Sequence, residues 1–180
     1  MSERYAVIGH PVAHSKSPLI HTEFARATGQ DIEYRRIEAA LDGFRRAVDE
    51  FRAAGGKGLN VTLPFKHEAF QYCGQASERA RTAEAVNTLV FQEPVFGDNT
   101  DGVGLVRDLE RNLHFDLRSG RALVMGAGGA AHGSSARCAK RGWRSWSSST
   151  APWRRRRRSR LAFRAPAAAA TRSWATNRSA

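Results

Sequence analysis

The chain has 180 residues, enough for one well-buried domain and the beginning of a second. Its formal net charge of +12 is unevenly placed, because residues 1–131 carry 16 basic and 17 acidic side chains whereas residues 132–180 carry 13 basic and none acidic. There is no long uncharged apolar run, no leader-like N-terminus and only two cysteines, which argues against a membrane span, a signal peptide and a disulfide framework. We expect a soluble, cytoplasmic protein.

The first elements follow apolar spacing and helix signals. Residues 5–10 form a short apolar run that ends in Gly and Pro, which is typical of a buried strand entering a loop. Ser17 before Pro18 is an N-cap pattern, and apolar side chains recur at helical spacing until Gly29. The sequence therefore predicts a strand, a loop and a helix.

Further strands and helices alternate along the chain. The pattern predicts a strand over 31–38, a helix over 41–51, a strand followed by a proline turn and a helix start over 57–66, two strands over 85–91 and 94–99, and a helix over 100–114 with Thr100 at its cap. Such alternation favours an α/β domain with a largely parallel sheet.

A glycine-rich turn follows the next apolar strand, at residues 121–125. Gly126, Gly128 and Ala131 have the G-x-G-x-x-A spacing in which backbone N–H groups approach a pyrophosphate at a helix start. The motif is weak alone, since any glycine-rich strand-to-helix turn imitates it. His10, His14 and His21 lack a carboxylate or thiol partner, so we expect no metal site.

Five motifs occur in one order: HSKSP (14–18), NVTLPFK (60–66), AVNT (85–88), NTDGVG (99–104) and GAGGAA (126–131). In these motifs the chain resembles the shikimate dehydrogenases. The resemblance implies a substrate-binding domain over 1–100, a linking helix over 101–120 and the start of an NADP-binding Rossmann domain over 121–131. It also implies interconversion of shikimate and 3-dehydroshikimate, in the pathway to aromatic amino acids.

Oxidation of a secondary alcohol requires a group that removes the hydroxyl proton and returns it in reverse. Lys66 is our candidate, with the Asp101 carboxylate to orient it, and the resemblance implies that they form the catalytic pair. The same resemblance assigns substrate binding to Ser15, Ser17, Thr62, Lys66, Asn87 and Asp101. It assigns NADP binding to Gly126, Ala127, Gly128, Gly129 and Ala130.

Structural roles would also explain these residues one at a time. Ser17 suits a helix cap, Thr62 a strand end and Asp101 a helix N-terminus. Lys66 on its own would be a solvated surface lysine. The order of the five motifs is what favours the functional interpretation.

Residues 132–180 have a different composition. They contain 12 arginines, all four tryptophans, one leucine and no valine, isoleucine or methionine, so we expect no Rossmann strand and a disordered or irregular segment. Translation in a shifted frame permits EAGVAEVVVVNRT around Trp146–Pro152, a strand followed by the Asn-Arg-Thr with which NADP-dependent members of the family read the 2′-phosphate. We therefore predict a frameshift in the gene or its assembly.

Three functions stay open at this stage. The first is an NADP-dependent shikimate dehydrogenase that is inactive as written, because its cofactor site is incomplete. The second is a quinate/shikimate dehydrogenase that uses NAD. The third is a non-enzymatic remnant that binds a ligand, or nucleic acid through Arg154–Arg158. We expect a small-molecule substrate and neither a membrane nor a nucleic-acid partner.

Overall fold

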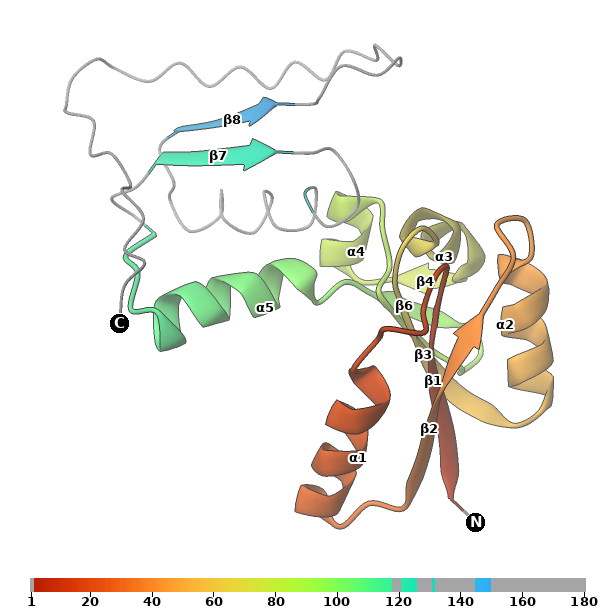
Figure 1. Cartoon of the computed structure of the whole chain (residues 1–180). Coiled ribbons are helices and arrows are strands. Elements are labelled where there is room, and N and C mark those ends of the chain that lie inside the picture. Colours follow the sequence, from red (N-terminus) through yellow and green to blue (C-terminus); the bar gives the residue numbers. More distant parts are fainter. Residues whose placement is uncertain (1, 118–120, 126–130, 132–144, 150–180) are drawn as a thin grey trace.

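The computed structural model describes residues 2–117, 121–125, 131 and 145–149 (Figure 1). Strands and helices alternate through its N-terminal part, in the order β1 (Glu3–Gly9), α1 (Ser17–Thr28), β2 (Ile32–Glu38), α2 (Phe44–Ala53), β3 (Gly56–Val61), α3 (Lys66–Tyr72), β4 (Gln75–Ala76), α4 (Glu78–Ala83), β5 (Thr88–Val90), β6 (Phe96–Asp98) and α5 (Asp101–Arg107). The π-helix η1 (Asp108–Asn112) continues α5, and β7 (Arg121–Met125) and β8 (Ser145–Ser149) form a second sheet.

The larger sheet has six strands in the order β2-β1-β3-β5-β6-β4. Its pairs are parallel except that β5 runs antiparallel to both neighbours. The predicted α/β fold with a largely parallel sheet is confirmed. The short β4 and α4 lack an apolar run of their own, so no local pattern predicted them.

The two faces of this sheet differ in chemistry. Ala6, Ile8, Leu59 and Val61 alternate along β1 and β3 and join the main core. The intervening positions include Tyr5, Val7 and Asn60, and Tyr34 lies opposite Tyr5 in the register. Helix α1 lies on the side of the sheet opposite α2 (Figure 1). The apolar face is therefore the one covered by α2.

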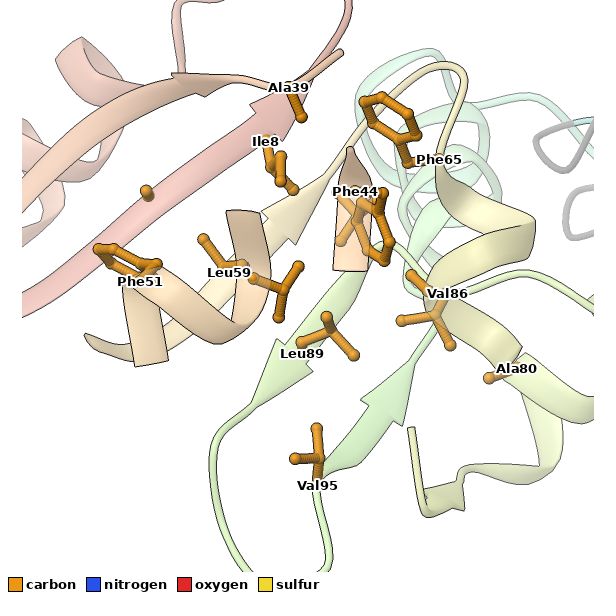
Figure 2. Close-up of a cluster of buried hydrophobic side chains, with 14 residues drawn as sticks. Ile8, Ala39, Phe44, Phe51, Leu59, Phe65, Ala80, Val86, Leu89 and Val95 are labelled. Atoms are coloured by element: carbon orange, nitrogen blue, oxygen red, sulfur yellow. The ribbon is translucent and has the colours of Figure 1, made fainter. Parts of the chain in front are cut away.

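Three phenylalanines lie in the core, two from α2 and one at the residue directly before α3 (Figure 2). Phe44 and Phe65 are 1% and 0% exposed, and their ring centroids lie 5.2 Å apart. Val48 and Phe51 extend the same apolar stripe of α2 toward β3. The end of this core at Phe65 fixes the backbone immediately before Lys66.

Helix α1 starts one residue earlier than the cap pattern predicted. Ser17 is the first residue of the helix and Lys16 occupies the N-cap position, so the assignment of Ser17 as the cap is wrong. The Ser15 side chain takes that role in part, because its Oγ accepts a hydrogen bond from the Ser17 backbone N–H at 3.2 Å. The Ser17 hydroxyl is thereby released from capping.

The expectation that residues after 131 form no strand is wrong for Ser145–Ser149. These residues form β8, which pairs in parallel with β7 from Arg121↔Ser145 to Met125↔Ser149. Pairing of backbone groups with an apolar neighbouring strand outweighs the weak strand preference of serine. The rest of the predicted irregular segment lies outside the described residues.

Candidate functional site

The candidate site lies where strand ends of the larger sheet meet. The register sets Asn60 of β3 opposite Thr88 of β5, and Thr88 opposite Asp98 of β6. Because β5 is antiparallel to both neighbours, its first residue lies beside their last ones. The segments that follow β3 and β6 and the one that precedes β5 therefore meet at one edge, as ligand sites of α/β sheets commonly do.

Lys66 and Asp101 form an ion pair at this edge. Lys66 Nζ donates to Asp101 Oδ2 at 2.7 Å, and the two side chains are only 15% and 24% exposed. Each is the first residue of a helix, α3 and α5 respectively. A short contact between partly desolvated charges holds both groups in one geometry.

Asn87 holds the other oxygen of the same carboxylate. Its Nδ2 donates to Asp101 Oδ1 at 2.8 Å, and its Oδ1 accepts from the Thr100 backbone N–H at 3.1 Å. Val86 N also donates to the Lys66 carbonyl at 2.8 Å. Side-chain and backbone bonds therefore bring Lys66, Asn87 and Asp101 together as one cluster, which we call the Lys–Asp cluster.

Two residues that the sequence analysis did not single out support this cluster. Asn99 is 2% exposed, donates to the Ala85 carbonyl at 3.0 Å and accepts from the Asp101 N–H at 3.1 Å. Thr100 occupies the N-cap position of α5, as predicted, but its side chain makes no cap bond and accepts from Asn87 Nδ2 at 2.9 Å. The signal for Asn99 was present in the sequence, since asparagine side chains commonly accept a hydrogen bond from the backbone N–H two residues on.

Asp98 anchors the start of the segment that carries Asn99 and Asp101. It accepts from Ser77 Oγ at 2.6 Å, from Arg79 Nε at 2.6 Å and from Arg79 Nη2. The Arg79 guanidinium, with the Ser77 hydroxyl and the Asn99 N–H, lowers the pKa of the Asp98 carboxyl to about 2. Asp98 is thus ionised and fully hydrogen-bonded at neutral pH.

Ser15 and Ser17 form a second group, the serine pair, at the loop between β1 and α1. Ser15 Oγ donates to Ser17 Oγ at 3.1 Å. Arg36 of β2 donates to the Ser15 carbonyl through Nε at 2.9 Å and through Nη2 at 2.5 Å. The pair is therefore held by the neighbouring strand as well as by its own loop.

Thr62, the remaining predicted substrate residue, lies one residue past β3. Its N–H donates to the Ile8 carbonyl at 2.9 Å, and its carbonyl accepts from the Phe65 N–H at 3.0 Å. Gly9 packs directly against it: a Cβ on Gly9 would come within 2.4 Å of Thr62 Cγ2. Thr62 therefore lies between the ends of β1 and β3, at the edge from which the serine-pair loop and Lys66 also extend.

The five residues predicted to bind the cofactor, Gly126, Ala127, Gly128, Gly129 and Ala130, lie outside the described residues. They directly follow β7, which has a parallel neighbour in β8, as in the first two strands of a dinucleotide fold. Within the described residues, no group of three or more His, Cys, Asp and Glu side chains is placed to hold a metal ion. No described helix is long and apolar enough to cross a membrane.

These features define a mixed α/β domain that presents a lysine–carboxylate pair and hydroxyl groups at one sheet edge. Residues 7–89 match the family model described as the shikimate dehydrogenase substrate binding domain. Over these residues the chain therefore matches the substrate-binding domain of the shikimate dehydrogenase family.

Whole-chain comparisons agree with that assignment. A protein named shikimate dehydrogenase (NADP(+)) from Chromobacterium violaceum is 60% identical over 134 residues, which are 74% of this chain and 49% of the relative. The structure of an Ael1 enzyme from Pseudomonas putida has 47% identity and a TM-score of 0.76, covering 83% of this chain and 55% of that one. A shikimate 5-dehydrogenase from Thermus thermophilus, solved in complex with NADP(H) and shikimate, has 34% identity and a TM-score of 0.75 over 82% of this chain and 56% of its own. The chain thus spans about half the length of the relatives that it matches.

Proposed function

We propose that this domain binds shikimate and 3-dehydroshikimate, and that the protein from which it comes interconverts them with NADP. The Lys66–Asp101 contact, with Asn87 on the second carboxylate oxygen, is the observation that carries the proposal. A polyhydroxylated ring acid needs several neutral donors and acceptors and one group that exchanges a proton. The Lys–Asp cluster, Thr62 and the serine pair supply this set.

In the oxidation, the ring hydroxyl gives its proton to the neutral amine form of Lys66. In the reduction, the Lys66 ammonium returns the proton to the new alkoxide. Asp101 fixes the Nζ position and balances the charge of the protonated form, which is how a carboxylate assists a general acid–base. Asn87 holds the carboxylate in turn. Ser15 and Ser17 bind the substrate carboxylate.

NADP supplies the hydride acceptor when it is bound, and the residues predicted to hold its phosphates are those of the turn after β7. The parallel β7–β8 pair fits the beginning of such a site. Thermus shikimate 5-dehydrogenase was solved with NADP(H), and a Listeria monocytogenes shikimate 5-dehydrogenase with NAD, so both cofactors belong in the assay. A rate that is higher with NAD would favour the quinate/shikimate alternative.

Binding to the full chain tests the substrate site. We expect the NMR or calorimetric titration with shikimate to saturate in the millimolar range or below. Lys66→Ala should weaken binding by roughly tenfold or more, because it leaves the Asp101 carboxylate without its partner. Lys57→Ala, which removes an exposed lysine of β3, is the matched control and should leave the titration unchanged. No response to millimolar shikimate would overturn the proposal.

We also propose that residues after about 132 come from a shifted reading frame. The valine run of the alternative reading overlaps β8, so the strand occurs where that reading puts one. Resequencing codons 125–150 tests the frame directly. The chain as written should turn over shikimate and NADP far more slowly than a frame-restored protein, in which Lys66→Ala should lower turnover by about 10² to 10⁴. Equal rates for the two proteins would contradict the frameshift.

A further inference from the structure

Tyr34 of β2 connects the serine pair to the middle of the sheet. Its hydroxyl donates to Asn60 Oδ1 at 2.6 Å, and the Ser17 side chain lies close enough to this hydroxyl to oppose the rise of its pKa. Ser15 Oγ donates to Ser17 Oγ, so a row of neighbouring polar side chains runs from the loop after β1, through β2, to β3. The four side chains come from three separate segments of the chain.

The ring of Tyr34 is fixed as firmly as its hydroxyl. It stacks on His21 of α1 with centroids 4.1 Å apart and an interplanar angle of 14°. His21 is itself tied back by a 2.8 Å hydrogen bond between Nδ1 and the Ser17 carbonyl. Tyr34 therefore packs on the helix turn that begins with Ser17.

We propose that Tyr34 is a positioning residue for carboxylate recognition, acting through Ser17. The inference rests on the proposed function, since the serine pair is assigned there to the substrate carboxylate. Two hydroxyl donors hold a carboxylate well only when their oxygens keep a fixed spacing, and the bonds from Arg36 of β2 fix the backbone of Ser15 but not the side chain of Ser17. The Tyr34 hydroxyl supplies a fixed point on the far side of Ser17.

Proton counting explains why a hydroxyl suits this position. Each serine has one proton, and a carboxylate that binds both serines uses the Ser17 proton and leaves Ser17 Oγ free to accept. The Tyr34 hydroxyl can then turn its proton from Asn60 Oδ1 to Ser17 Oγ, and the Asn60 side chain can rotate so that its Nδ2 donates to Tyr34. Burial raises the pKa of Tyr34 further above its usual value of 10, so the hydroxyl keeps its proton at neutral pH. Phenylalanine would preserve the stacking and lose the exchange.

Shikimate titration of the full chain tests the inference. Tyr34→Phe should weaken binding by roughly tenfold, the effect of one hydrogen bond near a charged ligand. Tyr72→Phe is the control, because it removes a tyrosine hydroxyl that donates to Asp49 at the same 2.6 Å distance, away from the serine pair.

Double mutants distinguish a specific effect of Tyr34 on Ser17 from a general loss of order in the site. In a Ser17→Ala background, Tyr34→Phe should add less than a twofold effect, whereas with Asn87→Ala in the Lys–Asp cluster the two effects should multiply. Tyr34→Phe that binds shikimate like the wild type would overturn this inference and leave the proposed function standing. A wild-type chain that does not bind shikimate would overturn both.

A measurement on the wild type covers the case in which Tyr34→Phe does not fold. The ¹³C resonance of tyrosine Cζ senses the hydrogen bonds of the hydroxyl. Shikimate should shift the Cζ signal of Tyr34 and leave that of Tyr72 in place. A Tyr34 signal that stays constant through saturation would show that Ser17 reaches the carboxylate without the help of Tyr34.

Discussion

The two faces of the six-stranded sheet differ in the chemistry of their side chains. The face under α2 is apolar, and Phe44 and Phe65 are buried there almost completely. On the opposite face Tyr34 and Asn60 are hydrogen-bonded to each other, and α1 exposes Leu19 and Phe24 to 63% and 61%. The face under α2 is apolar, whereas the other face sets the buried Val7 beside hydrogen-bonded polar side chains.

The difference shows how a small domain can hold precise polar geometry. Buried polar groups stabilise a fold little in net terms, but they cost much if their partners move. Here the apolar face supplies the rigidity, and its fully buried Phe65 directly precedes Lys66. Changes on the apolar face should therefore alter stability first, and changes at the sheet edge should alter binding first.

The largest expected effect is on stability, and it is seen by comparing two phenylalanine truncations, one on each side of the sheet. Phe44→Ala should lower the free energy of unfolding by about 3–5 kcal/mol, because it opens a cavity against Phe65. Phe24→Ala removes the same side chain from the exposed surface of α1 and should cost less than about 1 kcal/mol. Urea denaturation of both variants measures the difference. Similar losses would mean that the two faces do not differ as described.

Acid should weaken the polar edge before it affects the apolar core. The pKa of Asp98 is about 2 in the fold against 3.8 ordinarily, so this carboxylate contributes stability above pH 3.8 that is lost as the pH falls from about 4 to 2. The contribution is on the order of 2 kcal/mol at most, because a pKa difference of one corresponds to about 1.4 kcal/mol.

Removing the guanidinium isolates that contribution. Arg79→Ala should be less stable than the wild type at pH 6, and the two should converge toward pH 2, as measured by urea denaturation at each pH. Arg26→Ala, which removes an exposed ion pair with Glu23, should follow the wild type throughout. A constant difference between Arg79→Ala and wild type from pH 6 to pH 2 would show that Arg79 acts by packing alone.

Most of the fold was readable from the sequence because apolar spacing reports burial directly. The stripe of Phe44, Val48 and Phe51 predicted α2, and the alternation of strands and helices predicted the sheet type. The order of the motifs identified Lys66 and Asp101 as candidate site residues. Their 2.7 Å contact depends on how β3, β5 and β6 meet. No local pattern encodes that meeting, nor the contact of Tyr34 with Asn60, 26 residues away in the chain.

For the second sheet, the prediction from composition was wrong. Composition predicted no strand after residue 131, yet Ser147 to Ser149 form a ladder with Leu123 to Met125. Side-chain preference is a weak guide where an apolar partner strand is already present, because the ladder bonds are made by the backbone. Composition still argues that a serine-rich strand adds little apolar surface to a core.

The smallest expected effects come from two glycines that face open space. A Cβ on either Gly29 or Gly104 would meet no described heavy atom within 4 Å. Gly29 has a φ of 67° at the end of α1, so Gly29→Ala should cost about 1 kcal/mol through backbone strain. Gly104 lies inside α5, where its N–H donates to the Thr100 carbonyl at 2.9 Å. Gly104→Ala should therefore stabilise the chain by about 0.5–1 kcal/mol, because alanine loses less backbone entropy in a helix.

Thermal or urea denaturation of the two alanine variants tests whether their changes in stability have opposite signs. Each variant adds the same single methyl group. The comparison also tests what Gly104 is for, since it belongs to the NTDGVG motif and follows Asp101 by three residues. If Gly104→Ala is more stable and binds shikimate unchanged, neither packing nor substrate requires a glycine there. If it is more stable but binds shikimate less well, the missing side chain leaves room for the ligand beside the Lys–Asp cluster. A destabilised Gly104→Ala would contradict the helical environment described for this residue.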